Sequence, residues 1–178
     1  MILRRFRAAR DGRTIRDLYG AIVAQSRNET FYRGYGVPDT VQGRFDLIVL
    51  HLILVLDRLG RDATGARNIG QRLFDIFCSD LDDNLREMGV GDLAVPKHMR
   101  RFAEAFYGRQ QVYVAAIAAS EPRDLEMALA RNIFGETEEG GEGPRRLASY
   151  VRDAARRLEI QDSGAILRGE VVFPQPIL

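Results

Sequence analysis

The densest group of chemically active side chains is acidic. Asp80, Asp82, Asp83 and Glu87 lie close together in one stretch of the chain. Helical spacing places Asp80, Asp83 and Glu87 on one face and Asp82 on another. Paired aspartates on a helix can hold Mg²⁺ for diphosphate chemistry, but such a site needs a second acidic motif on a facing helix, where this chain has only scattered carboxylates. The pattern favours a solvated or partner-facing acidic stripe over a small all-α metal-dependent enzyme.

Two histidines and one cysteine are the other candidates for catalysis. His51 lies inside an apolar run from residue 47 to 56, which predicts a buried imidazole hydrogen-bonded to a neighbour. Neither His51 nor His98 can be combined with a nucleophile and an orienting acid. Cys78 falls on an apolar helical face and is typical of a small core residue, and a single cysteine excludes an internal disulfide. We therefore predict no enzymatic activity, no metal site and no cofactor.

The composition is that of an ordinary globular domain. The chain has 178 residues, of which 46% are hydrophobic and 29% charged, with a formal net charge of +1. That length predicts one domain with its own core, and that charge indicates no specific nucleic-acid partner. The longest apolar run is about half of the ~20 residues that span a bilayer. We expect a cytoplasmic protein.

The elements that position these residues are helices. Apolar residues recur at helical spacing throughout, and no series of strands is evident. We expect an all-α, single-domain bundle of about six or seven helices with an irregular C-terminal tail. Six helices are expected: one from Thr14 onward, three over 41–59, 66–88 and 95–119, and two that begin at Pro122 and at Pro144.

Three segments are predicted along the chain. Residues 1–13 form a basic N-terminal arm, with Thr14 capping the first helix, and residues 14–160 form the helical domain. Within that domain, the glycine- and glutamate-rich segment 135–143 is expected to be a mobile loop, and residues 161–178 an extended tail. The alternation of arginine with apolar residues in the arm leaves open a membrane- or ribosome-surface adaptor as an alternative function.

The junction between the third and fourth helices carries more charge than a turn requires. Leu81, Leu85, Met88, Gly89 and Pro96 are sufficient to pack two helices and turn the chain between them. The remaining charged side chains are surplus to the fold, and this surplus indicates a recognition surface; they are Asp82, Asp83, Arg86, Glu87, Asp92 and Lys97.

Several unusual strings occur in an order that is similar to a known family. They are Tyr35-Gly36-Val37-Pro38-Asp39-Thr40, Gly43-Arg44-Phe45-Asp46, the stretch from Leu81 to Asp92, Val95-Pro96-Lys97 and Phe106-Tyr107-Gly108-Arg109. From about Tyr19 to Ile117 the chain resembles the ubiquinol–cytochrome c chaperone family. Because the long presequence of mitochondrial members is missing, we expect a bacterial-type member.

The resemblance implies a non-enzymatic, all-α chaperone for assembly of the cytochrome bc1 complex, respiratory chain complex III. Mitochondrial members of the family act on newly made cytochrome b, together with a small helper protein, near the ribosome and the inner membrane. The resemblance thus implies cytochrome b as a client and a position peripheral to the inner membrane.

A client of this kind presents apolar helices with basic flanks, so exposed aromatic and acidic side chains should bind it. Tyr107 and Arg109 are residue types enriched in binding hot spots, and they flank Gly108, whose place inside a helix suggests close packing or a bend. The residues predicted to bind partners are Tyr32, Tyr35, Asp80, Asp82, Asp83, Arg86, Glu87, Asp92, Lys97, Tyr107 and Arg109.

Overall fold

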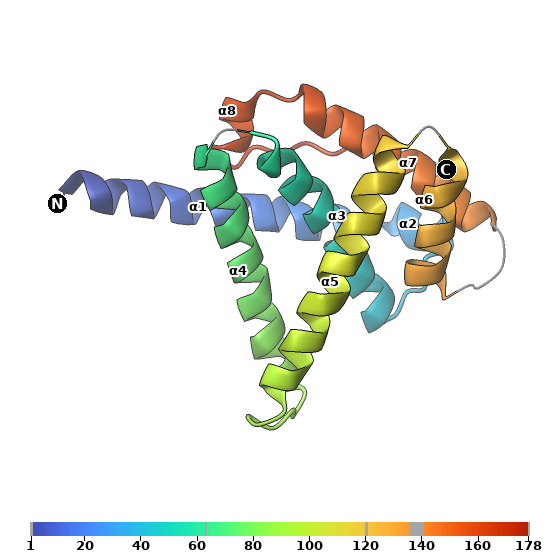
Figure 1. Cartoon of the computed structure of the whole chain (residues 1–178), viewed down its shortest axis with the longest axis horizontal. Helices are drawn as coiled ribbons and strands as arrows, with labels where there is room; N and C mark the ends of the chain where they lie inside the picture. The colour runs from blue at the N-terminus through green and yellow to red at the C-terminus, as the bar shows by residue number, and fades with distance from the viewer. Residues whose placement is uncertain (1, 63, 120, 136–140, 178) are drawn as a thin grey trace.

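The computed structural model describes residues 2–62, 64–119, 121–135 and 141–177, with side chains from residue 12 onward except at 64 and 65. These residues form one all-α bundle without a strand (Figure 1), so the predicted fold class is confirmed. The elements are α1 (Ile2–Ser26), α2 (Glu29–Arg33), α3 (Val41–Gly60), α4 (Thr64–Glu87), α5 (Val95–Ala118), α6 (Pro122–Leu129), the π-helical segment η1 (Ala130–Phe134), α7 (Glu142–Ile160) and α8 (Ser163–Ile166).

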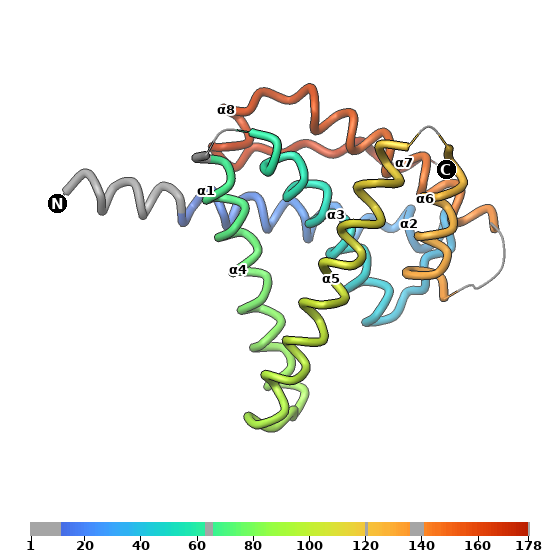
Figure 2. Tube along the Cα trace, in the orientation of Figure 1, coloured from blue at the N-terminus to red at the C-terminus, as the bar shows by residue number. Residues whose placement is uncertain are grey.

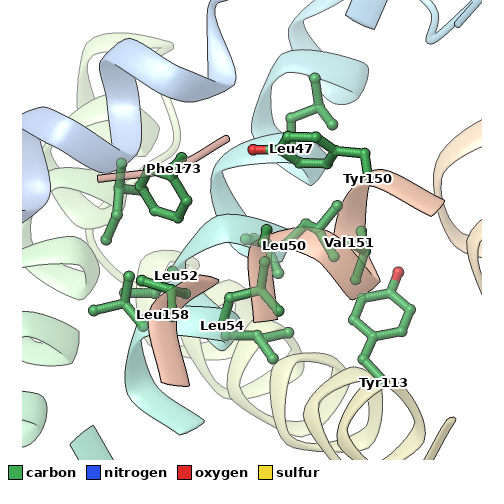
Figure 3. Close-up of a cluster of buried hydrophobic side chains, with 14 of the residues drawn as sticks. Leu47, Leu50, Leu52, Leu54, Tyr113, Tyr150, Val151, Leu158 and Phe173 are labelled. Carbon is green, nitrogen blue, oxygen red and sulfur yellow. The ribbon is translucent and has the colours of Figure 1, made fainter. Parts of the chain in front are cut away.

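Helix α3 is the centre of the core. It contacts α1, α4, α5, α7 and η1, as expected for a helix that is apolar nearly all round. Figure 3 shows its labelled leucines beside Tyr150, Val151 and Leu158 of α7, Tyr113 of α5 and Phe173 of the tail. Burying a side chain of this size contributes about 1.5–3 kcal/mol, so α3 is the main source of hydrophobic stabilisation.

The first helix begins earlier than expected. The predicted start at Thr14 is wrong, because α1 begins at Ile2. The preceding residues include five arginines and two alanines, which have high helix propensity, and no proline. Thr14 is buried, and its hydroxyl donates to the Leu167 carbonyl at 3.4 Å instead of capping the helix.

Helices α4 and α5 form an antiparallel hairpin that projects away from the rest of the bundle (Figures 1 and 2). As predicted, glycine ends α4: Gly89 has φ 85°, and the Val90 N–H donates to the Leu85 carbonyl at 3.0 Å. This is the Schellman arrangement, which favours glycine because a Cβ is strained at positive φ. Pro96 then lies in the first turn of α5.

The C-terminal residues pack back onto the bundle. The segment that we expected to be extended contains α8 and then runs as an extended strap from residue 170 to 177. The Gln161 side chain both donates to and accepts from the Val172 backbone, at 2.8 and 2.9 Å. Phe173 is buried, and the Tyr35 hydroxyl accepts from the Ile177 N–H at 3.0 Å. The strap is therefore part of the fold, while the division into three segments stays a prediction.

The predicted loop at 135–143 falls largely on residues 136–140, which lie outside the described part of the chain. Its two ends are described. Gly135 closes η1 with φ 69°, and Gly141 is the N-cap of α7. Mobility of this loop stays a prediction.

His51 is fully buried and hydrogen-bonded, as predicted. Its Nδ1 lies 2.7 Å from the Leu47 carbonyl and its Nε2 lies 2.8 Å from the Tyr150 hydroxyl. Because a carbonyl can only accept, Nδ1 carries the proton and Nε2 accepts from Tyr150. Gln25 then donates to the Tyr150 oxygen at 3.0 Å. These contacts satisfy a neutral imidazole inside the core.

Two arginines bind the C-terminal ends of neighbouring helices. The terminal nitrogens of Arg152 in α7 donate to the carbonyls of Ala116 and Ala119 at the end of α5, both at 3.1 Å. Arg58 of α3 donates from Nε to the Leu158 carbonyl of α7 at 2.8 Å. The last carbonyls of a helix lack partners within it and carry partial negative charge. These guanidinium groups therefore join α3, α5 and α7.

Two glycines should respond in opposite ways to substitution by alanine. A Cβ at Gly108 would meet nothing within 4 Å, so close packing inside this chain does not explain that glycine, whereas at Gly43 it would lie 2.0 Å from the Pro38 carbonyl oxygen. We expect Gly108→Ala to raise the free energy of unfolding by about 0.5–1 kcal/mol, the helix-propensity gain, and Gly43→Ala to lower it. Urea denaturation of both variants measures this, and equal effects would contradict it.

Candidate partner-binding surface

The predicted acidic stripe lies along α4, on the projecting hairpin. Asp80, Asp83 and Glu87 are all exposed there. Asp80 accepts a hydrogen bond from the Tyr19 hydroxyl of α1 at 2.7 Å, and burial together with this bond raises the pKa of Tyr19 above its ordinary value. Asp80 therefore holds α4 against α1, whereas Asp83 and Glu87 point their charge at solvent without an ion pair in the described residues.

A second set of charges closes the end of the hairpin. Arg86 donates from Nε to Asp82 at 2.7 Å and from Nη1 to Asp92 in the turn. The hydrogen bond to Asp82 is the first cause of the raised pKa of Arg86. These three residues, predicted as surplus charge, thus form a local network across the turn. Lys97 is exposed in the first turn of α5.

Tyr107 and Arg109 point to different environments. Tyr107 is 53% exposed, with its ring centroid 6.0 Å from that of Phe74. A cavity of about 180 Å³ opens beside it between α3, α4 and α5. Arg109 instead reaches into the bundle, where its Nη1 lies 2.5 Å from Oδ1 of the buried Asp46. Tyr107 therefore remains available at the surface, and Arg109 has a structural contact.

The two tyrosines of the α2 region are tied into the fold. The Tyr32 hydroxyl donates to the Ser26 carbonyl at 2.7 Å, and burial raises the pKa of Tyr32. Tyr35 is buried, with its ring edge-on to Phe31 at 5.7 Å. The structure thus separates the predicted residues into an outer group on the hairpin and an inner group, made of Tyr32, Tyr35 and Arg109, that holds helices and tail together.

Aromatic rings continue from the bundle into the hairpin. Phe45 of α3 stacks on Phe77 of α4 at 5.9 Å and meets Phe102 of α5 edge-on at 5.7 Å. Phe102 lies 5.8 Å from Phe106. Aromatic pairs of this kind contribute about 0.5–1.5 kcal/mol beyond their area. Beyond them, the hairpin end has little apolar cover.

The apolar side chains at that end are the residues that sequence reasoning missed. Met88 was predicted to face inward with Leu81 and Leu85, but it is 72% exposed, and Leu93 in the turn is 99% exposed. The spacing of apolar residues in α4 predicts which face of the helix is apolar. It does not predict how far along the helix other elements bury that face. The available clue was that Leu93 lies between turn-forming residues, with Gly89 and Gly91 before it and Pro96 after it.

The geometry does not favour the metal-dependent alternative. Among the described residues, no group of three or more His, Cys, Asp or Glu side chains is placed to hold a metal ion. A cavity of about 410 Å³ is lined by Arg58 and Arg152, but their nitrogens already donate to backbone carbonyls. Within the same residues, no helix combines the length and apolar content that crossing a membrane requires.

Comparison with known proteins points to one family. The family described as ubiquinol-cytochrome C chaperone matches residues 33–173. Ubiquinol-cytochrome-c reductase complex assembly factor 1 of Xenopus laevis is 25% identical over 157 residues, which cover 88% of this chain and 78% of that protein. The proteins of the same name from mouse and human are also 25% identical, and the chain spans only 52% and 56% of their lengths.

A solved structure extends this likeness to nearly the whole chain. The crystal structure of the Cbp3 homolog from Brucella abortus matches with a TM-score of 0.88 and 34% identity, covering 98% of this chain and 97% of that one. This likeness to a bacterial protein supports the expected bacterial-type member. The matched family and the named relatives are chaperones and assembly factors, which confirms the prediction of a non-enzymatic protein. Because the family match extends over more than half of the chain, from the end of α2 into the strap, the protein belongs to the ubiquinol–cytochrome c chaperone family.

Proposed function

We propose that this protein is an assembly chaperone for ubiquinol–cytochrome c reductase and that its client is newly made cytochrome b. The family match over residues 33–173 carries the proposal, and the names of the vertebrate relatives, which are assembly factors for that complex, support it. A small helper protein and a cytoplasmic position at the inner membrane belong to the same proposal.

The α4 side of the hairpin is the surface that we assign to the client. Asp83 and Glu87 are exposed and without an ion pair in the described residues, and the apolar Met88 lies next to them, 72% exposed. A newly made membrane protein presents apolar helices with basic flanks, which such a surface can bind through contact and charge. Tyr107 adds an exposed aromatic ring on the neighbouring helix.

Crosslinking in cells tests the client. A photoreactive amino acid at position 83 should capture cytochrome b, and one at Ile160 should not. Ile160 is the matched control because it is 85% exposed and lies at the end of α7, away from the hairpin end (Figure 1). Equal capture at both positions, or capture at position 83 of proteins that never include cytochrome b, would contradict the assignment.

Charge reversal tests the acidic edge itself. Asp83→Lys combined with Glu87→Lys should reduce capture of cytochrome b at least tenfold while moving the melting temperature little, because exposed charges contribute about 0–1 kcal/mol to stability. The control reverses two exposed acids of α7, Asp153→Lys with Glu159→Lys, which changes the net charge equally. Pull-down from membranes compares the α4 and α7 variants. Undiminished capture of cytochrome b by the α4 variant would contradict the assignment of this surface to the client.

A further inference from the structure

The end of the α4–α5 hairpin carries an apolar patch that the described residues leave uncovered. Leu93 is 99% exposed and Met88 is 72% exposed, five residues apart in the same turn. Single exposed apolar side chains are common on protein surfaces. Two large ones at the end of a projecting hairpin, surrounded by charge, are typical of a contact surface.

The unpaired charges around this patch are acidic on α4 and basic on α5. Asp83 and Glu87 lie on the α4 edge, and Lys97, Arg100 and Arg101 lie on the α5 edge. All five are exposed, and none forms an ion pair within the described part of the chain. The intervening Arg86 is already bound by two aspartates. The hairpin therefore presents an acidic edge and a basic edge on the two sides of one apolar end.

The charges of the two edges also lie at similar distances from the hairpin end, measured along the helix axes. Asp83 lies one turn from the end of α4 at Glu87, about 6 Å along the axis, and Arg100 lies five residues from the start of α5 at Val95, about 7.5 Å. Lys97 and Glu87 lie closer to the turn. A two-fold rotation therefore places the acidic edge of one copy opposite the basic edge of another, with both apolar ends between them, which is the self-complementarity that an isologous dimer requires.

We propose that this hairpin end is the contact surface of a homodimer, formed through α4 of one copy and α5 of the other. Charge complementarity fixes the pairing, and the burial of Leu93 and Met88 supplies the hydrophobic part of the association free energy. The dimer does not depend on the proposed client. Because Asp83 and Glu87 belong to both surfaces, a bound client and a second copy exclude each other.

Analytical ultracentrifugation of the full chain tests the dimer. The wild-type mass should rise from 20.1 kDa toward twice that value with protein concentration, and high salt should oppose the rise. The acid-reversed variant, Asp83→Lys/Glu87→Lys, and the base-reversed variant, Lys97→Glu/Arg100→Glu, should each dimerise at least tenfold more weakly. Mixed together, they should form a heterodimer with wild-type affinity, because each reversed edge then meets its opposite.

The mixing result separates a specific contact from general charge effects. Leu93→Ser should weaken association with no loss of folding, because that side chain is 99% exposed, and circular dichroism checks the fold of every variant. A wild-type chain that stays at 20.1 kDa at every concentration overturns the proposal. So does a variant that dimerises like wild type, or a mixture of two folded variants that remains monomeric. Client capture is measured separately, so its failure leaves this result standing.

Discussion

Replacing Arg109 by methionine is expected to lower the free energy of unfolding by about 3–5 kcal/mol. The Asp46 side chain is only 4% exposed, and Arg109 Nη1 lies 2.5 Å from its Oδ1. In the variant, the carboxylate keeps only Gln42, whose Nε2 donates to both oxygens at 3.0 Å. Removing one partner of a buried pair leaves an uncompensated charge in the core, which is the costly case. Urea denaturation at pH 7 measures the loss.

Two further variants isolate the cause. Replacing both members of the pair, Asp46→Leu with Arg109→Met, should recover most of the loss, because an apolar pair of similar volume needs no charge compensation. Arg44→Met removes an exposed pair with Asp39, whose atoms lie 2.7 Å apart, and should cost far less, because solvent screens exposed charges. If Arg44→Met and Arg109→Met cost the same, burial is not what makes the inner pair important.

Acidification is expected to destabilise the protein through His51. Burial lowers the pKa of His51 from 6.5 to about 4. The unfolded state therefore binds the proton first as the pH falls, so this contribution to stability is complete above pH 6.5 and is lost progressively down to about pH 4. The loss between pH 7 and pH 5 is about 2 kcal/mol for a difference of this size. Urea denaturation at the two pH values measures it.

The control keeps the burial and removes a hydrogen bond. Tyr150→Phe loses the hydroxyl that lies 2.8 Å from His51 Nε2, yet it should retain most of the pH dependence, because desolvation is the first cause of the shifted pKa. His51→Leu should reduce the dependence by about 2 kcal/mol over the same interval. A variant without His51 that loses stability as steeply as wild type would rule out this origin.

The sequence predicted the helices well because their signals are local. The apolar surface of α3 indicated a central helix, and it is in contact with five other elements. Gly89 indicated the end of α4, and Pro96 the beginning of α5, because these residues restrict backbone geometry directly. The start of α1 was harder to predict, since a polar capping residue such as Thr14 is also compatible with a helix that continues on its N-terminal side.

The candidate surface depended on contacts that local patterns do not contain. Arg109 looked like a hot-spot residue, but its charge is used by Asp46, which is 63 residues away in the chain. Met88 continued the apolar period of α4, but it lies just beyond the end of that helix at Glu87 and is 72% exposed. The acidic edge, by contrast, was predictable, because Asp83 and Glu87 are four residues apart and therefore share one helical face.

The strap makes the cover of the core depend on helices that are distant in the sequence. His51 is covered from one side by Phe173, whose ring centroid lies 5.1 Å away. Gln25 of α1 donates to the Pro174 carbonyl at 3.0 Å, and Gln161, at the end of α7, binds the Val172 backbone. Docking of the strap therefore requires α1 and α7 to be in place, and all three belong to one cooperative unit of the fold.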